Sequence, residues 1–365
     1  MHAKQYQRVK LAATFTKSVL VWAAVVVFVA LGGNEILADA VEARVASDYL
    51  AAASYVLVVW LALSALTFPL EFFVDFHLER RYGLSEQTFG RWFLDETKSV
   101  AIAVALFAPL AALWFHLLRT IDIYWFLPFG GVHFLFTVVL AQLAPTLLLP
   151  LFYDLSPLED EGLRERLRRL AERHGLRVES ISTIGMSKRT KKANAAFAGL
   201  GATKRLLVGD TLLEICDDDE IEAAAAHEIG HYKNGHIVKL LVIGGAAQFA
   251  LFLALALLYD LAATRLGYAP TDLAAIPLFL VVAAPLFALL KPAMNALSRR
   301  FEYEADRFAA RALRNSSALV SALKKISDRN LGDPSPHPFV EWYFYSHPSI
   351  TKRARRVAKE AKWAS

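Results

Sequence analysis

The sequence predicts a mainly α-helical protein that crosses a membrane about six times and places a polar portion with short strands on the cytoplasmic side. Three observations support this fold class. Hydrophobic residues make up 56% of the 365-residue chain, whereas a soluble domain has about 45–50%. Six apolar runs approach the ~20 residues that a helix needs to cross the hydrocarbon core. Basic residues gather in alternate connecting segments, which is typical of the cytoplasmic side of a membrane protein.

The expected spans lie at 18–33, 51–68, 99–118, 124–152, 237–259 and 276–297. Prolines inside three of them are compatible with helices, because neighbouring helices can satisfy the freed carbonyl groups. The first run also resembles a secretory signal peptide, since four basic residues precede it and Ala38-Asp39-Ala40 follows it. We expect an uncleaved first span instead, because this triplet lies well beyond the apolar run.

Charges in the connecting segments predict an orientation. The first 17 residues carry four basic and no acidic side chains, while acidic residues outnumber basic ones in 34–49 and 260–275. The positive-inside rule therefore places both termini in the cytoplasm, together with 69–98, 153–236 and 298–365. The net charge of +5 would also suit a nucleic-acid-binding protein. No basic stripe interleaved with aromatic residues supports that function, so we expect no nucleic-acid partner.

The chain divides into four parts. They are an N-terminal set of transmembrane helices with the cytoplasmic loop 69–98 (1–152), a cytoplasmic segment (153–236), a transmembrane helix pair (237–297) and a C-terminal segment (298–365). In the cytoplasmic segment, hydrophobic patterning predicts a helix at 158–175, strands at 178–185, 192–199 and 204–210, and a helix from Asp217 to about Gly235. In the C-terminal segment it predicts helices at 298–313 and 317–329, and four prolines predict irregular structure over 330–348.

The stretch AAAAHEIGHYKNGH at 223–236 carries the chemistry. His227 and His231 are four residues apart on a helix, so both side chains can reach one metal ion. Glu228 can point at the open coordination position, where it would act as a general base on water. This spacing is the zincin arrangement, in which the metal lowers the pKa of water and polarises a carbonyl group. The alternative is a solvated polar helix face, which we consider inferior because small residues precede the motif and allow close packing.

A third metal ligand is required, and the segment FEYEAD at 301–306 is the best source. Glu302 and Asp306 share one helix face, so one carboxylate can ligate the metal while the other orients a ligating histidine. The spacing alone does not say which does which. His236 is an alternative ligand, but its position beside Gly235 at the expected helix end favours a structural role.

Several segments together resemble the CAAX prenyl protease 1 family of integral-membrane zinc metalloproteases. They are AAAAHEIGHYKNGH, SRRFEYEADRFA and FYSHPSITKRARR, with FHLERRYGLSEQT, SKRTKKANAAFAGLGATKRLLVGDTLL and SDRNLGDP in the family's order. The resemblance runs from about residue 55 to the C-terminus. It implies six or seven helices that enclose a hydrophilic chamber, with a cytoplasmic zincin-like catalytic portion carrying a short β-hairpin or sheet.

The resemblance also implies roles for the metal-site residues. His227, His231 and Glu302 would hold one Zn²⁺ ion per chain, and Glu228 would be the catalytic base. Asp306 would support a ligating histidine. By this resemblance, Glu302 would be the carboxylate of FEYEAD that binds the metal.

Further residues follow from the same resemblance. His347 would stabilise the oxyanion, helped by Arg353. Asn194, Ala195 and Ala196 match the family's substrate-binding edge strand, to which a peptide adds as a further strand. The sequence reads NAAFAG there, with alanines where the family strand has aromatic residues.

The expected function is therefore that of a membrane-embedded zinc metalloendopeptidase of the CAAX prenyl protease type. Its partners would be membrane lipid and a peptide or protein substrate, including prenylated or other hydrophobic-tailed ones. The bias toward Ala, Leu and Arg favours a bacterial source, and hence the inner (plasma) membrane. One alternative is a general membrane quality-control protease of the HtpX kind. A remote one is a transporter with a structural metal site, although a base between two histidine ligands has no purpose there.

Overall fold

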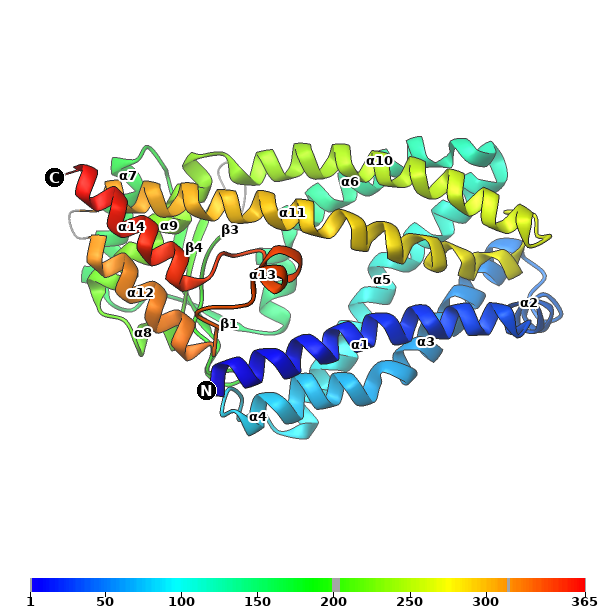
Figure 1. The fold of residues 1–365 in the computed structure, drawn as a ribbon, viewed down its shortest axis with the longest axis horizontal. Helices are drawn as coiled ribbons and strands as arrows, with labels where there is room; N and C mark the ends of the chain where they lie inside the picture. Colours follow the sequence, from blue (N-terminus) through cyan, green and yellow to red (C-terminus); the bar gives the residue numbers. More distant parts are fainter. Residues whose placement is uncertain (1, 199–203, 314–315, 365) are drawn as a thin grey trace.

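The computed structural model describes residues 2–198, 204–313 and 316–364 and shows an elongated, mainly helical molecule (Figure 1). Its long helices are α1 (His2–Ala30), α3 (Asp48–Glu71), α5 (Phe89–Ile121), α6 (Phe126–Leu143), α10 (His236–Arg265) and α11 (Ile276–Ala312). Shorter elements connect them: α2 (Gly33–Glu42), a π-helical stretch (Phe72–Leu78), α4 (Glu79–Arg81), 3₁₀ turns (Asp122–Trp125, Leu149–Leu151, Leu273–Ala275) and a second π-helical stretch (Ala144–Leu148).

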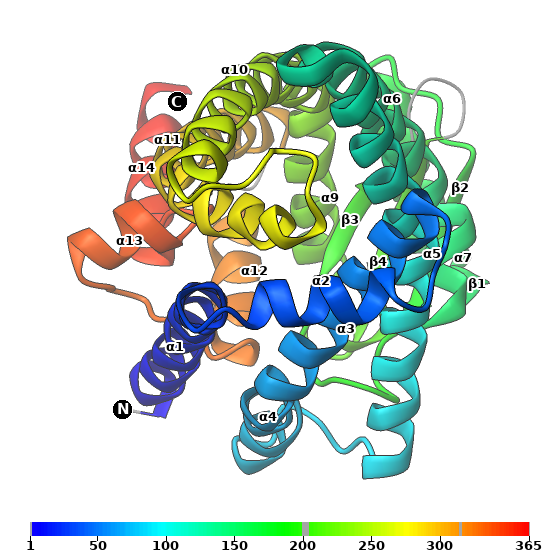
Figure 2. The same cartoon turned by 90° about the vertical axis from the view of Figure 1, so that its right-hand side faces the viewer.

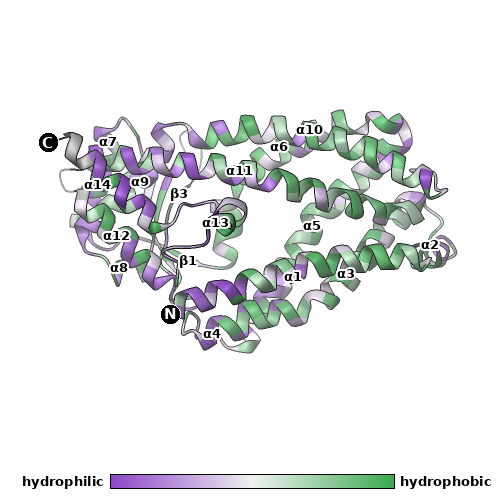
Figure 3. Ribbon diagram, viewed as in Figure 1, coloured by the Kyte–Doolittle hydropathy of each residue, from purple (hydrophilic) through white to green (hydrophobic). Residues whose placement is uncertain are grey.

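Each of the six expected spans falls mainly within one long helix, although 18–33 runs into α2 and 124–152 also includes 3₁₀ and π-helical turns. Among the described residues, five continuous helical stretches are long and apolar enough to cross a membrane, and one of them, Phe89–Leu151, contains both α5 and α6. Figure 2 shows these helices arranged around a common centre. Figure 3 shows that their middle parts are hydrophobic, whereas the end of the molecule that carries the C-terminus is polar. The sequence therefore predicted the order and approximate positions of the long apolar helices.

The first apolar helix is packed into this bundle. α1 begins at His2, so the basic N-terminal residues are helical too. The buried Tyr6 hydroxyl donates to Glu79 Oε1 at 2.5 Å, and Trp22 Nε1 donates to the carbonyl of Val281 at 3.0 Å. α1 thus contacts the segment after α3 and also α11, as an integral part of the fold.

One helix lies where the sequence predicted a loop. α2 occupies much of 34–49 and crosses the end of the bundle that faces the viewer in Figure 2. Asn34 is fully buried there, and its Nδ2 donates to the carbonyl of Ala274 at 2.8 Å. Because this fixation depends on a residue 240 positions away, local sequence patterning does not reveal it.

The polar end holds a four-stranded sheet in the order β1-β2-β4-β3. The strands are β1 (Asp154–Pro157), β2 (Ser180–Gly185), β3 (Ala195–Ala198) and β4 (Arg205–Gly209). β2 and β4 pair in parallel, and β1 and β3 pair antiparallel to them at the two edges. The three expected strands are present, while β1 was not expected, because the sequence DLSP has low strand propensity and ends in proline. Proline is tolerated there since β1 is an edge strand.

Helices cover this sheet and build a separate core. They are α7 (Glu161–Arg173), α8 (Asp210–Leu213), α9 (Asp218–Lys233), α12 (Ser316–Arg329), α13 (Pro338–Phe344) and α14 (Ile350–Ala364). Leucines of α7 pack against Leu206, Leu212 and Ile229 in this core, where each fully buried side chain contributes about 1.5–3 kcal/mol. α13 corrects the expectation of irregular structure over 330–348. Pro338 opens it at a position where proline suits a helix, and the His337 side chain caps it.

α11 joins the two ends of the molecule. The sequence predicted a span at 276–297 and a separate helix at 298–313, but the structure has one continuous helix of 37 residues. Ile276 and Ala283 belong to the core of the membrane helices, whereas Ala309 belongs to the core beneath the sheet. A shift of α11 in the membrane would therefore be transmitted directly to residues 301–306.

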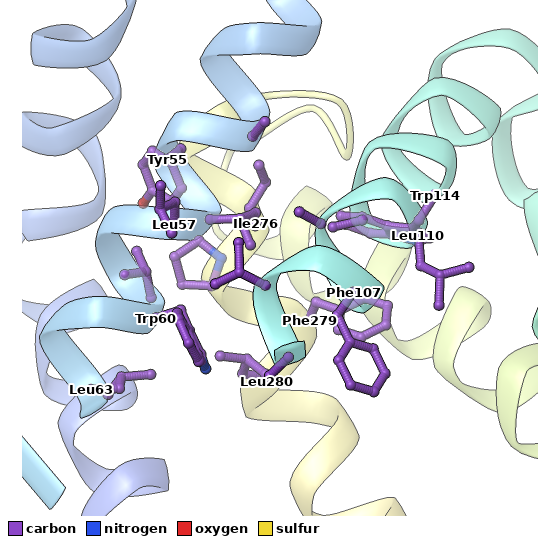
Figure 4. A pocket seen from close by; sticks show the side chains of 18 of the residues that line it. Tyr55, Leu57, Trp60, Leu63, Phe107, Leu110, Trp114, Ile276, Phe279 and Leu280 are labelled. Atoms are coloured by element: carbon purple, nitrogen blue, oxygen red, sulfur yellow. The ribbon is translucent and has the colours of Figure 1, made fainter. Parts of the chain in front are cut away.

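A cavity of about 500 Å³ lies among α3, α5, α6, α10 and α11 at the end of the bundle far from the sheet (Figure 4). Its wall is almost entirely apolar and includes Trp60, Phe107 and Leu280. Ile276, also in the wall, precedes Glu302 by 26 residues on α11, which corresponds to about 39 Å of helix. The space enclosed by the membrane helices is therefore apolar at this distant end.

Candidate active site

α9 carries His227, Glu228 and His231 and is fixed firmly at its N-terminus. Asp217 and Glu220 form a capping box, in which each side chain accepts from the other residue's backbone N–H. The buried Glu220 carboxylate also accepts from Ser321 Oγ at 2.5 Å and from Lys325 Nζ at 2.6 Å, both on α12. Burial alone would raise the pKa of Glu220, but these hydrogen bonds outweigh it and lower the pKa below its usual value. The cap therefore closes the N-terminus of α9 and also anchors this helix to α12.

A glycine lets α9 and α11 approach each other closely. A Cβ atom built on Gly230 would lie 3.0 Å from the carbonyl oxygen of Ala305 and 3.1 Å from its Cα. Both partners are backbone atoms, which cannot rotate away. Gly230 thus brings the face of α11 that carries Glu302 and Asp306 against the two histidines of α9.

Three side chains from these two helices could hold a metal ion. The Nε2 atoms of His227 and His231 are 3.2 Å apart, and Glu302 carboxylate oxygens lie 3.5 Å and 3.3 Å from them. Ligand atoms bound to one tetrahedral zinc ion lie about 3.4 Å apart, given bonds of about 2.0–2.1 Å. In addition, Glu302 Oε2 is buried and makes no hydrogen bond within the described part of the chain. The donor set and its spacing fit zinc.

Asp306 and Arg353 lie directly behind this group. Asp306 Oδ1 is 3.0 Å from His227 Nδ1, the ring nitrogen opposite the metal-facing one. Arg353 in the first turn of α14 donates to both Asp306 oxygens, at 2.6 and 2.8 Å, and lies 3.1 Å from Glu302 Oε2. Burial and the Arg353 charge act to lower the pKa of His227, but its hydrogen bonds with Asp306 and Glu302 outweigh them and raise the pKa to about 9. The two carboxylates therefore favour positive charge at the His227 ring.

Glu228 and His347 lie on the accessible side of the site. Glu228 is partly exposed and has no hydrogen-bond or ion-pair partner among the described residues, so its carboxylate is free to accept a proton. His347 follows α13 in an exposed loop, with its Nε2 3.3 Å from Glu302 Oε1 and its Nδ1 2.9 Å from Ser346 Oγ. Arg299 of α11 holds this loop through the carbonyl of Tyr345 at 2.6 Å.

Unlike the exposed His347, Arg353 has a buried side chain. Its guanidinium group donates to Asp306 and forms an ion pair with Glu302. His236, considered above as an alternative ligand, lies outside the group of three ligands and contacts His231 from behind.

The expected substrate strand is the edge strand β3. Asn194, immediately before it, is exposed, and its carbonyl accepts from Gly209 N at 2.9 Å. Ala195 pairs with Val208 and Ala196 with Leu207 of β4. Within the described residues no strand pairs with the other edge of β3, so its backbone groups there are available to an extended peptide.

Sequence reasoning missed a residue that positions this strand. Asn330 donates to the carbonyl of Ala193 at 3.0 Å and accepts from its N–H at 2.8 Å, as a strand partner would. Asn330, His347 and Arg353 line a cavity of about 430 Å³. Of these wall residues, Asn330 contacts the start of the edge strand, whereas His347 and Arg353 contact Glu302. No spacing rule marks Asn330, because it acts on a segment 137 positions away.

Comparisons with known proteins cover nearly the whole length of the chain. Residues 157–361 match the family model "Peptidase family M48", and residues 1–154 match the model "CAAX prenyl protease N-terminal, five membrane helices". The crystal structure of Ste24p from S. mikatae superposes with a TM-score of 0.86 at 26% identity, covering 98% of this chain and 88% of that one.

Curated relatives give the same result. CAAX prenyl protease 1 of Saccharomyces cerevisiae is 31% identical, over 78% of this chain and 67% of the yeast protein. The metalloprotease YhfN of Bacillus subtilis, described as uncharacterized, is 28% identical over 98% of this chain and 85% of its own length. The human CAAX prenyl protease 1 homolog is 27% identical, over 80% and 71% of the two chains.

Proposed function

The chain belongs to peptidase family M48 and is a multi-pass membrane metalloprotease, and on this premise we propose that His227, His231 and Glu302 hold one zinc ion. The observation that carries the proposal is the convergence of these three side chains, from two helices, at the spacing of tetrahedral ligands. Zinc bound there would supply a Lewis acid that polarises the scissile carbonyl and lowers the pKa of water to about 7.

Glu228 is the general base in this proposal. It follows His227 on α9, so its carboxylate projects beside the ligands and toward the accessible side. Its freedom from hydrogen-bond partners within the described residues lets it take a proton from the attacking water and return it to the leaving amine. A catalytic base already held by an arginine or lysine would be a poorer proton acceptor.

Asp306 and Arg353 hold the ligands in this proposal. Asp306 accepts from His227 Nδ1–H, which fixes the tautomer that leaves Nε2 free to bind metal. Arg353 balances the charge of two buried carboxylates and fixes their positions through its planar, bidentate donors. Its contribution to the oxyanion is therefore indirect.

His347 is the group that stabilises the developing oxyanion. Its ring is the exposed imidazole next to Glu302 and is mounted on a loop that Arg299 fixes. Groups of this kind contribute about 2.7–4 kcal/mol of transition-state stabilisation.

The substrate peptide binds along β3, with backbone hydrogen bonds to the Asn194–Ala196 edge. The side chains of Ala195 and Ala196 are small, so they leave room for bulky substrate side chains and select weakly among them. Backbone hydrogen bonds to β3 would therefore supply the affinity for the peptide, while the groups around His347 would position the scissile bond.

The substrate class is a peptide with a prenylated or otherwise hydrophobic tail near the scissile bond, the chemistry named for the yeast and human relatives. The wall residue of the apolar cavity that is nearest to Glu302 along α11 is Phe287, 15 residues away, which corresponds to about 22 Å of helix, or about six to seven residues of an extended peptide. A tail next to the scissile bond would therefore begin between the metal-binding end and the adjacent membrane helices and point toward that cavity.

The catalytic portion faces the cytoplasm, and the membrane is the plasma membrane of a bacterium. The distribution of basic residues supports this orientation. The start of α1 and the C-terminal helices lie at the same end of the molecule (Figure 1), which is consistent with an even number of spans, and the similarity to the Bacillus subtilis protein extends over 98% of the chain.

The test compares a farnesylated CAAX peptide with the same peptide lacking the lipid and with an unmodified unfolded protein, each with wild type and Glu228→Gln. Preferred cleavage of the farnesylated peptide by wild type alone supports the proposal. Preferred cleavage of the unfolded protein would instead assign the chain to general membrane quality control. Equal activity of both variants would exclude the proposed base.

A further inference from the structure

His236 is a buried histidine that the mechanism above does not use. It opens α10 directly after the turn at Gly235, and its side chain is almost inaccessible. Its Nδ1 lies 3.0 Å from His231 Nδ1, and its Nε2 lies 3.1 Å from Glu304 Oε2. We propose that His236 and Glu304 form a positioning pair that holds His231 as a neutral, Nε2-binding metal ligand; this rests on the proposed zinc site.

The proton positions in this series of hydrogen bonds follow from the ligand role of His231. A neutral imidazole that offers Nε2 to a metal carries its proton on Nδ1. That N–H must donate to His236 Nδ1, so His236 cannot carry a proton there without two N–H groups facing each other. The proton of a neutral His236 then lies on Nε2 and donates to Glu304 Oε2. Each ring nitrogen of His231 and His236 then has one role, and the Glu304 carboxylate accepts the last hydrogen bond of the series.

The local fold places His236 behind His231. Gly235 has φ of 65°, a left-handed conformation that favours glycine, and it turns the chain between α9 and α10. Without this turn, a residue five positions after His231 would lie on another face of the helix. The His236 ring then stacks on Phe301, with centroids 4.3 Å apart and an interplanar angle of 7°.

Glu304 is held in turn from its own helix. Arg300 Nε donates to Glu304 Oε1 at 3.0 Å, so the other oxygen is oriented toward His236. Three carboxylates of α11 thereby serve the same site. Glu302 faces the metal position, Asp306 contacts His227 directly, and Glu304 contacts His231 through His236.

This geometry also excludes His236 as a metal ligand. Its Nδ1 faces the Nδ1 of His231, on the side of that ring away from the Nε2 that meets His227 and Glu302. A metal ion among the three ligands is therefore shielded from His236 by the His231 ring. The effect of His236 on the metal must pass through His231.

The test measures zinc affinity by competition with a chelator on the purified full-length protein in detergent. His236→Phe keeps a ring that can stack on Phe301 and removes the acceptor. His236→Asn keeps an acceptor near the Nδ1 position and loses contact with Glu304. Glu304→Gln keeps the acceptor for His236 and removes the charge. Tyr303→Phe is the control on α11, because no hydrogen bond involves its hydroxyl within the described residues.

We expect His236→Phe to raise the zinc Kd about 10–100-fold, the effect typical of second-sphere partners of metal ligands. His236→Asn should recover part of this loss, and Glu304→Gln should weaken binding less than His236→Phe. The double variant His236→Phe/Glu304→Gln should bind no more weakly than His236→Phe alone, because Glu304 acts through His236. In ¹⁵N-histidine spectra of the zinc-loaded wild type, His231 should be the Nδ1–H tautomer and His236 the Nε2–H tautomer.

Two results would overturn the inference: a zinc Kd of His236→Phe within about threefold of wild type, or fully additive effects in the double variant. If His236→Phe does not fold, His236→Asn and Glu304→Gln decide the matter by the same measurement. Failure of the zinc site itself is distinguishable, since wild type would then bind no stoichiometric zinc.

Discussion

Gly230 of α9 and Ala305 of α11 approach so closely that a methyl group on Gly230 would lie 3.0 Å from the Ala305 carbonyl oxygen. This contact sets the distance between α9, which carries His227 and His231, and α11, which carries Glu302. Gly230, one of the residues between the two histidines, is therefore constrained by helix packing.

Gly230→Ala should displace α11 from α9 and separate Glu302 from the two histidines. Overpacking of this kind costs about 1–3 kcal/mol of stability, and we expect a zinc affinity lower by on the order of tenfold. Gly244→Ala in α10 is the matched control, because a Cβ there has no neighbour within 4 Å. Metal analysis after dialysis against a chelator measures the effect. Equal zinc retention in the two variants would show that the close contact does not set the site.

Glu220→Gln tests the anchor of α9 through its pH dependence. The pKa of Glu220 is lowered in the folded state, so its ionised form stabilises the protein above its usual pKa near 4.5, and this contribution disappears as the pH falls through the lower folded-state value. The variant should lose about 1.5–3 kcal/mol at pH 7 and lose less stability than wild type on acidification. Thermal unfolding from pH 7 down to about pH 2, well below the usual pKa, measures this. Glu165→Gln, at an exposed position, is the control, and parallel pH profiles of wild type and Glu220→Gln would contradict the prediction.

Arg353→Ala should be among the most destabilising substitutions at the site. It would leave Glu302 and Asp306 as two buried carboxylates without their shared cation, and loss of one member of a buried ion pair costs about 3–5 kcal/mol. Arg353→Lys should restore only part, because an ammonium group lacks the bidentate fork. Unfolding of both variants is compared with that of Arg355→Ala, an exposed position on the same helix. A loss below ~1 kcal/mol for Arg353→Ala would exclude the charge-balancing role.

His347→Ala should lower kcat about 10²–10³-fold while zinc remains bound, since the residue acts on the oxyanion and not on the metal. Its exposure predicts little change in stability. Steady-state kinetics with a fluorogenic peptide, together with metal analysis, separate these effects. His174→Ala, at the end of α7, is the control. A rise in KM at constant kcat would assign His347 to substrate binding instead.

The sequence was sufficient to predict those elements whose formation depends on neighbouring residues in the chain. The long apolar helices, the helix ending near Gly235 and the three strands after residue 178 all follow from periodicity and capping, and the structure has them. The positions of Glu302 and Asp306 on one face of a helix also followed from their spacing. What the spacing left open was their division of labour, which depends on how α9 and α14 pack around α11.

The features that sequence reasoning missed depend on distant contacts. α2 is fixed by Asn34 on the carbonyl of Ala274, and the edge strand is held by Asn330 on Ala193. The role of His236 required the turn at Gly235 and the stacking on Phe301, neither of which a ligand motif describes. A single asparagine or histidine has no periodic signature, so only the folded arrangement reveals these partners.

The central claim is that Glu228 is the base of a zinc peptidase whose ligands are His227, His231 and Glu302. The most direct measurement is mass spectrometry of the products from an unbiased peptide library, with wild type and Glu228→Gln, alongside their zinc content. We predict one zinc per chain in both proteins, with internal peptide-bond cleavage by wild type and a loss of at least ~10³-fold in the variant. Cleavage by Glu228→Gln at the wild-type rate, with zinc bound, would contradict the mechanism.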